Sequence, residues 1–161
     1  MMRKINTILS IILLIFVNGC AGYEPIFSSK NVKFAIEKYS IEGDKIIGNK
    51  IYSKLYNLSK RQKNSQNIRA IKILINATKN KNTTSKDGTG KILEYKVELN
   101  VSIKINDFLT NNMIIDQTFI SSTNYKAQDQ YSETIKLENA SIENLINNLY
   151  QKLLIELSQN I

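Results

Sequence analysis

The sequence predicts an α+β domain built as a two-layer sandwich. A four-stranded, largely antiparallel sheet is covered on one face by two helices, in the order β-α-β-β-β-α. Apolar and polar residues alternate over residues 93–105, which is the period of a strand with one buried face. Apolar residues recur at helical spacing over residues 47–58 and again over residues 135–157. Because each such face must be buried against another element, the pattern predicts one domain over residues 31–161.

The first strand and the first helix are joined by a short polar turn. Val32, Phe34 and Ile36 alternate with small or polar neighbours, as in a half-buried strand. The turn over residues 40–44 ends at Asp44, whose carboxylate suits the N-cap of a helix. The helix that follows has one apolar face, formed by Ile47, Ile51, Leu55 and Leu58.

The second and third strands are predicted to form a hairpin. The second begins at Arg69 and has apolar residues at alternate positions, namely Ile71, Ile73, Ile75 and Ala77. Residues 78–90 lack large apolar side chains and contain the turn pair Asp87-Gly88, so we expect a polar hairpin tip there. The third strand has the sharpest alternation, with apolar residues Leu93, Tyr95, Val97, Leu99, Val101, Ile103 and Ile105.

The remaining residues predict a turn, a strand and a long helix. After a turn over residues 106–112, the fourth strand covers residues 113–125, with Ile115, Phe119 and Ile120 as its larger apolar residues. A helical stripe then follows, made of Ile135, Ile142, Leu145, Ile146, Leu149, Leu153 and Leu157. The last three strands can pair as antiparallel hairpins because their connections are short, whereas the first strand can join only through the first helix.

The N-terminal segment has the layout of a secretory signal peptide. Arg3 and Lys4 precede residues 8–17, which are apolar apart from Ser10. An apolar run this short does not span a bilayer as a helix, since spanning takes about 20 residues. We therefore assign residues 1–19 to a cleaved leader.

Cys20 is the only cysteine of the chain and directly follows this leader. The segment ending at Gly19 and Cys20 resembles the lipobox of bacterial lipoproteins, which implies cleavage before Cys20 and acylation of its sulfur and new amino group. Two or more acyl chains hold a protein on a bilayer, because each buried methylene contributes about 0.8 kcal/mol. Residues 20–30 then predict a lipidated tether. The alternative is an ordinary buried thiol after a plain signal peptide.

Composition excludes several classes of function. The chain has no histidine, which excludes a Ser/His/Asp triad and a histidine-based metal site. We therefore predict a protein that is not an enzyme and that needs no cofactor or metal. The formal charge of +8 suits an anionic partner such as a phosphorylated lipid. Export argues against nucleic acid as that partner.

Four lysines surround the predicted hairpin tip: Lys79, Lys81, Lys86 and Lys91. Only Asp87 opposes them in this part of the sequence. The functional hypothesis is that they contact lipid phosphates or acidic loops of a partner, where each hydrogen bond would be charge-assisted. The alternative is that they are solubilising residues of a loop.

Residues 20–27, Cys-Ala-Gly-Tyr-Glu-Pro-Ile-Phe, resemble the start of mature LptE, the lipopolysaccharide-assembly lipoprotein of the outer membrane, in its alphaproteobacterial form. That form begins with a motif of the type Cys-Gly-Phe-x-Pro-Leu-Tyr, from which this chain departs by aromatic substitutions and by the extra residue Ala21. The element order agrees, as do the polar group at 121–125 and the Tyr-Ser pair at 131–132.

The resemblance implies an outer-membrane lipoprotein, anchored on the periplasmic side, that plugs the lumen of a large β-barrel partner, LptD. On this interpretation it helps to assemble the barrel and takes part in moving lipopolysaccharide to the outer leaflet, with lipid A phosphates as a possible contact. A second interpretation is an accessory periplasmic-facing lipoprotein of a lipid-trafficking ABC transporter. A hydrolase using a serine with lysine or carboxylate help is the third, and no nucleophile elbow or Ser-x-x-Lys context supports it.

Overall fold

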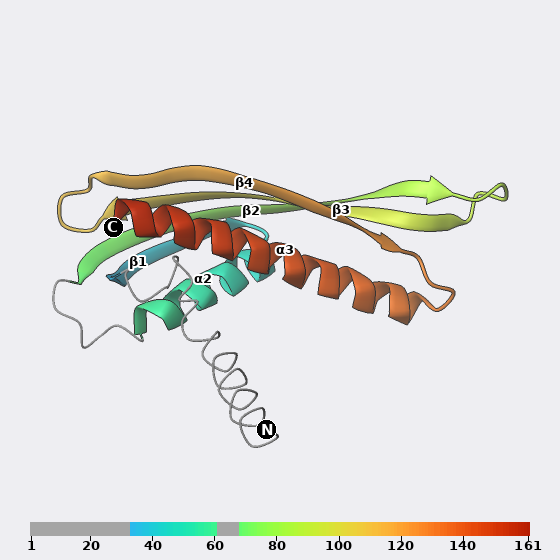
Figure 1. The fold of residues 1–161 in the computed structure, drawn as a ribbon, viewed down its shortest axis with the longest axis horizontal. Coiled ribbons are helices and arrows are strands. Elements are labelled where there is room, and N and C mark those ends of the chain that lie inside the picture. The colour runs from blue at the N-terminus through green and yellow to red at the C-terminus, as the bar shows by residue number, and fades with distance from the viewer. Residues whose placement is uncertain (1–32, 61–67) are drawn as a thin grey trace, which may run out of the picture.

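The computed structural model describes residues 33–60 and 68–161, in which two helices lie on the same face of a twisted sheet (Figure 1). The strands are β1 (Phe34–Gly43), β2 (Arg69–Lys86), β3 (Ile92–Asp107) and β4 (Met113–Lys126). The helices are α2 (Lys45–Lys60) and α3 (Tyr131–Asn160). The order β-α-β-β-β-α and the α+β class predicted from the sequence are confirmed.

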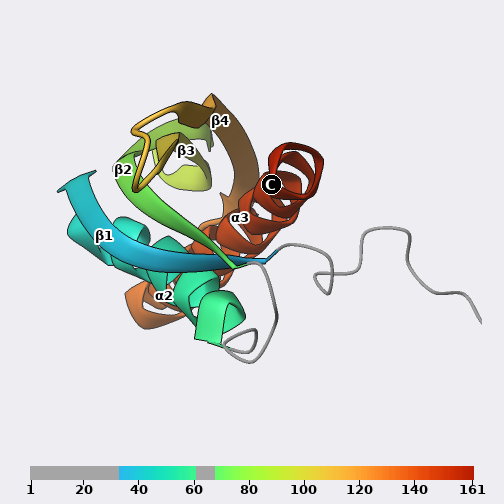
Figure 2. The same ribbon diagram turned by 90° about the vertical axis from the view of Figure 1, so that its left-hand side faces the viewer.

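The sheet follows the order β1-β2-β3-β4, so that β1 and β4 form its two edges (Figure 2). β1 runs parallel to β2, with Phe34 opposite Arg69 and Gly43 opposite Ala77. The other two pairings, β2 with β3 and β3 with β4, are antiparallel. The parallel pair requires a crossover connection, and α2 supplies it.

The start of α2 is fixed by the two residues that end the preceding turn. The carboxylate of Asp44 accepts hydrogen bonds from the backbone N–H groups of Ile46 and Ile47 at 3.0 and 3.1 Å, which confirms the predicted N-cap. Gly43 has φ of +70°, a conformation that side-chain-bearing residues rarely adopt. β1 therefore turns sharply into α2, and the strand is longer than the sequence pattern indicated.

β2 also continues beyond its predicted end. Residues 78–86, expected to be part of a hairpin tip, pair with β3 as far as Lys86 opposite Ile92, and the turn is confined to residues 87–90. Asp87 closes that turn, since its carboxylate accepts hydrogen bonds from the N–H groups of Thr89 and Lys91. The polar side chains misled the prediction, because ladder hydrogen bonds join backbones and do not require an apolar face.

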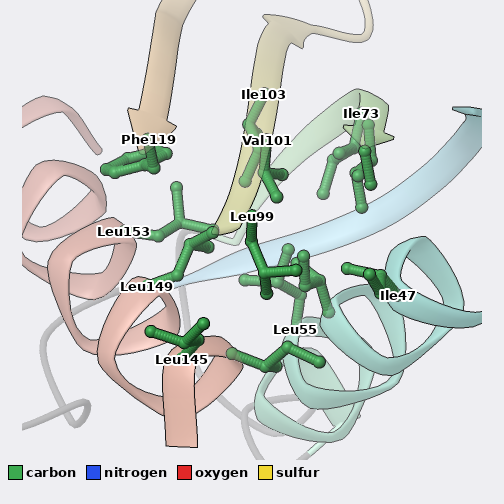
Figure 3. Close-up of a cluster of buried hydrophobic side chains, with 14 of the residues drawn as sticks. Ile47, Leu55, Ile73, Leu99, Val101, Ile103, Phe119, Leu145, Leu149 and Leu153 are labelled. Atoms are coloured by element: carbon green, nitrogen blue, oxygen red, sulfur yellow. The ribbon is translucent and has the colours of Figure 1, made fainter. Parts of the chain in front are cut away.

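The core fills the space between the sheet and the two helices (Figure 3). α2 packs on β1 and β2, and α3 packs on β4 and β3. All four apolar residues predicted for α2 are buried, as are those of β2 from Ile71 to Ala77. The other buried apolar residues of the sheet and α3 are Phe34, Val97, Leu99, Val101, Ile103, Ile105, Ile115, Phe119, Tyr125, Ile142, Leu145, Ile146, Leu149, Leu153 and Leu157.

Several apolar residues differ from their predicted burial. Ile120 is 61% exposed, because successive side chains of a strand point to opposite faces and Phe119 takes the inner one. Leu93 is exposed at the outer end of β3, beyond the reach of the core. Ile135 is only partly buried, since the first turns of α3 direct Thr134 and Glu138 inward.

Candidate functional site

A buried carboxylate lies where α3 begins beside the outer half of the β2–β3 hairpin. The side chain of Glu138 is 10% exposed and receives one hydrogen bond from Lys81 Nζ at 2.6 Å and one from Tyr125 Oη at 3.0 Å. Lys79 Nζ lies at 3.5 Å from its other oxygen. This one carboxylate therefore joins two strands, β2 and β4, to the helix α3.

Two tyrosines enclose the lysine end of the cluster. The rings of Tyr95 on β3 and Tyr125 on β4 are stacked with centroids 5.6 Å apart. The ammonium of Lys81 lies 4.3 Å from the centroid of the Tyr95 ring and 5.7 Å from that of Tyr125. The cation is therefore held between a carboxylate and two aromatic faces, both of which favour its charged form.

The pKa values in this cluster follow from burial and from the paired charges. Burial by itself would raise the pKa of Glu138, but the hydrogen bonds from Lys81 and Tyr125 and the charges of both lysines outweigh it and lower that pKa. Desolvation opposes the charge of Lys81, yet its bond to Glu138 keeps the lysine pKa raised. Burial is the main reason that the pKa of Tyr125 is raised. Glu138 and Lys81 are thus both charged at neutral pH, while Tyr125 stays a neutral phenol that donates to the carboxylate.

Strand parity explains how the two lysines come to lie on the helix side of the sheet. Odd-numbered residues of β2 from Ile71 to Ala77 face the core, and Lys79 and Lys81 continue the same side past its edge. Glu138 occupies the inner face of α3, one helical turn before Ile142. Sequence reasoning did not identify Glu138. The sequence signal that could have identified it is its position four residues before Ile142, which places a carboxylate on the apolar face of the helix.

The structure divides the four predicted contact lysines into two pairs. Lys79 and Lys81 are 34% and 30% exposed at their side chains and are engaged by Glu138. Lys91, near the tip, pairs with Asp129 at 2.8 Å in a fully exposed position. Lys86 forms no ion pair within residues 33–60 and 68–161. The expectation that Asp87 alone opposes these lysines was wrong, because α3 and the loop before it bring two acids that lie far away in the sequence.

A second group of charges joins the two helices. Glu143 of α3 accepts a hydrogen bond from Lys50 of α2 at 2.9 Å and lies 3.6 Å from Lys54 Nζ, and the first contact lowers the pKa of the glutamate. An open depression of about 370 Å³ borders the pair and is lined by Asn49, Lys50, Ser53, Lys54, Asn57 and Glu143. The depression is open and polar, and its amide and hydroxyl groups can be solvated by water. We therefore assign it no role.

Neither cluster has the composition of a metal site. Within the part of the chain that the structure describes, no three Cys, Asp or Glu residues come together as metal ligands. Each functional group around Glu138 has a partner inside the protein, since every buried side-chain nitrogen or oxygen among the described residues is hydrogen-bonded. The geometry fits a clamp between elements better than a reaction centre.

The predicted lipidation site lies outside the described residues, as do the leader and the tether over residues 20–30. Among the helices that the structure describes, none combines the length and the apolar character needed to cross a bilayer. The described domain begins at residue 33, close to the end of the predicted tether.

Comparison with solved structures identifies proteins of the same fold. A candidate lipoprotein of Caulobacter crescentus is 13% identical and superimposes with a TM-score of 0.54, covering 77% of this chain and 88% of that one. A minor lipoprotein of Acinetobacter baumannii is 19% identical with a TM-score of 0.52, covering 79% and 94%.

A solution structure of uncharacterised lipoprotein B from Nitrosomonas europaea is 16% identical with a TM-score of 0.52, covering 77% of this chain and 83% of that one. No family model matches the chain, and no curated protein matches it in sequence. At these identities the likeness establishes a shared fold. It does not single out LptE among small proteins of this build.

Proposed function

We propose that this chain is a bacterial lipoprotein held in the envelope by acyl chains on Cys20. One coincidence carries the proposal: a leader that ends at Gly19, directly before Cys20, precedes a fold shared with the three lipoproteins of solved structure compared above. The chain has no second cysteine with which Cys20 could form an intramolecular disulfide. Acylation would explain a lone cysteine directly after the leader, whereas an ordinary buried thiol would not need this position.

We further propose that the domain acts as a plug in a large outer-membrane β-barrel that moves lipopolysaccharide, as the resemblance of residues 20–27 to LptE implies. The support in the fold is the outer face of the sheet, which no helix covers within the described residues. This face is largely polar and carries two charge pairs, Lys96 with Glu98 at 3.2 Å and Lys104 with Asp116 at 3.1 Å. A wet barrel wall requires such a surface.

Lys86 and Lys91 are the candidate contacts for lipid A phosphates or acidic barrel loops. Both lie at the β2–β3 tip, where Lys86 forms no ion pair among the described residues and Lys91 pairs only with the exposed Asp129. Lys79 and Lys81 are less suited, because a phosphate would have to compete with the carboxylate of Glu138. Of the four lysines proposed as contacts, Lys86 and Lys91 thus remain the candidates.

Mass spectrometry of the native product tests the anchor. We expect a mature chain that begins at Cys20 and carries the mass of acyl chains, and a Cys20→Ser variant that leaves the membrane fraction. An unmodified thiol at residue 20, or release of the wild-type protein by high salt, would refute the anchor.

Co-purification after detergent extraction tests the partner. The plug interpretation requires a large outer-membrane β-barrel to copurify with this chain, whereas an inner-membrane ATPase in its place would favour an accessory subunit of a lipid-trafficking ABC transporter. The double variant Lys86→Gln/Lys91→Gln should weaken lipopolysaccharide binding or barrel capture. Its matched control is Lys38→Gln/Lys72→Gln, which removes the same charge from two exposed, cross-strand positions remote from the tip.

A further inference from the structure

The turn between β3 and β4 exposes apolar side chains. Leu109 is 84% exposed, Met113 64% and Phe108 46%. Single exposed apolar residues are ordinary on protein surfaces, but three within residues 108–113, at the turn and the first residue of β4, form a local apolar tip. The corresponding turn between β2 and β3 is polar, with the sequence Asp-Gly-Thr-Gly over residues 87–90.

The backbone of this apolar tip is held in place by hydrogen bonds. The carboxylate of Asp107 accepts from the N–H groups of Leu109 at 3.0 Å and Thr110 at 2.9 Å. Asn111 adopts a φ of +58°, which asparagine tolerates better than most residues, and its N–H donates to the Asp107 carbonyl. The turn therefore presents Phe108 and Leu109 from a fixed frame.

The tip lies at the end of the molecule where the described chain begins. The N–H of Phe108 donates to the carbonyl of Ala70 at 2.9 Å, and Arg69 Nε donates to the Asp107 carboxylate at 2.8 Å. Arg69 is paired with Phe34, the first residue of β1. Figure 1 shows the β3–β4 turn, the starts of β1 and β2 and the C-terminal end of α3 together at its left-hand side, opposite the β2–β3 tip.

The proposed anchor limits how far this end can lie from the bilayer. The chain from Cys20 to Phe34 spans at most roughly 50 Å when fully extended. The apolar tip is thus tethered within reach of the lipid, at the end of the domain where the described chain begins. The surplus positive charge of the chain also favours approach to an anionic bilayer surface.

We propose that Phe108, Leu109 and Met113 insert into the boundary between head groups and acyl chains of the bilayer that holds Cys20. This inference rests on the proposed lipid anchor and adds a second, non-covalent membrane contact to it. Burial of these side chains in lipid would orient the domain, with the β3–β4 tip at the membrane surface near the anchor and the β2–β3 tip at the far end of the domain. The two ends of the sheet would then have different environments.

A fluorescent reporter at the tip tests the contact in the full, acylated chain. Because the chain has one cysteine and acylation occupies it, a Leu109→Cys variant offers a single free thiol for an environment-sensitive dye. Thr89→Cys is the matched control, on the exposed turn at the opposite end. Both are placed in vesicles of phosphatidylethanolamine and phosphatidylglycerol, with nitroxide-labelled lipid or aqueous iodide as quencher.

We expect the reporter at position 109 to be blue-shifted and quenched severalfold more by nitroxide lipid than the reporter at position 89, and less by iodide. Equal quenching by iodide at both positions would overturn the proposal. Protection from both quenchers at position 109 would also overturn it, because the tip would then be covered by protein.

The anchor and the tip contact can fail separately. If mass spectrometry shows an unmodified Cys20, the reporter is placed in a Cys20→Ser chain, in which lipid quenching at position 109 still decides the tip contact. In that chain, Phe108→Ser/Leu109→Ser/Met113→Ser should lower vesicle binding by more than about tenfold. An acylated chain whose tip remains open to iodide keeps the anchor and loses the contact.

Discussion

At the scale of single residues, Glu138 joins one helix and two strands through a single carboxylate. Its carboxylate receives groups from β2 and β4 while it belongs to α3. One negative charge faces two ammonium groups, so the cluster keeps a surplus positive charge that the aromatic rings of Tyr95 and Tyr125 help to accommodate. Removal of the Glu138 carboxylate would leave the Lys81 ammonium beside two aromatic rings without a counter-ion.

We predict that Glu138→Gln lowers the free energy of unfolding by about 1–2 kcal/mol. The loss stays below the value for a fully buried pair, because both lysines are about one-third exposed and are partly screened by water. The matched control Glu143→Gln breaks a pair whose carboxylate is 42% exposed and should cost less than about 0.5 kcal/mol. Equal losses in urea denaturation would contradict the clamp.

The carboxylate of Asp107 gives the turn at the opposite end a dependence on pH. Hydrogen bonds from the Thr110 backbone and from Arg69 lower its pKa from 3.8 to about 2. A lowered pKa in the folded state stabilises the fold at pH values above the ordinary value, and that contribution is lost as pH falls from about 4 toward 2.

We therefore predict that Asp107→Asn removes part of the acid sensitivity of unfolding between pH 4 and pH 2, while the asparagine oxygen still accepts the turn hydrogen bonds. Arg69→Gln should remove a smaller part of it, since the backbone donors remain. Unfolding midpoints measured across this range check both. An Asp107→Asn chain with the wild-type pH profile would show that folding does not lower the pKa of this carboxylate.

At the scale of elements, the junction of β1 and α2 depends on close approach of the backbone to neighbouring groups. A Cβ atom on Gly48 would overlap the Cγ2 methyl of Ile41, and one on Gly43 would overlap the carbonyl oxygen of Ala77. Gly48 lies inside a helix, where alanine is normally preferred by about 1 kcal/mol. The sequence alone would therefore give the wrong sign for this substitution.

We predict that Gly48→Ala destabilises the protein by about 1–3 kcal/mol, because the overlap outweighs the gain in helix propensity. The methyl of Ile41 is bonded directly to its Cβ and cannot rotate away independently. Adding Ile41→Ala should recover much of the loss that Gly48→Ala causes on its own. Asn57→Ala, at an exposed position of the same helix, is the control and should be neutral or slightly stabilising. Thermal unfolding of the wild type, of Gly48→Ala, of Ile41→Ala and of the double variant completes the double-mutant cycle.

At the scale of the whole molecule, the sheet is unevenly supported along its length. β2 lies between β1 and β3 as far as Ala77, where it also contributes to the core. Beyond Ala77 β1 has ended, and residues 78–86 form a sheet edge with exposed side chains. Lys79, Lys81 and Lys86 lie on this edge, where charged side chains also hinder pairing with another chain.

We predict that backbone amides of residues 71–77 exchange with deuterium far more slowly than those of residues 78–86. The first group is covered on both sides and by α2, so its exchange requires unfolding of the core, whereas the second can open locally. Hydrogen-exchange mass spectrometry of the full chain makes the comparison. Equal protection of both segments would indicate that a further element covers the free edge of β2.

The sequence by itself determined the element types, their order and most of the core. Period-two and helical patterns are set by the geometry of the backbone, so the inner faces of β2 and α2, and that of β3 from Val97 to Ile105, could be assigned residue by residue. The N-cap at Asp44 followed for the same reason, since it depends only on neighbouring residues. Acylation of Cys20 and the four lysines as contact residues came from motif and charge, and they stay predictions.

Only the tertiary structure decided which distant groups meet. Glu138 pairs with Lys81, and Asp129 pairs with Lys91, because α3 packs back along the sheet. These lysines therefore have acidic partners that the local sequence does not show. The length of β2 was likewise decided by pairing with β3, whose backbone groups stabilise a polar strand that has no pattern of its own. Local periodicity records which face a residue takes, whereas contacts between segments far apart in sequence arise from packing.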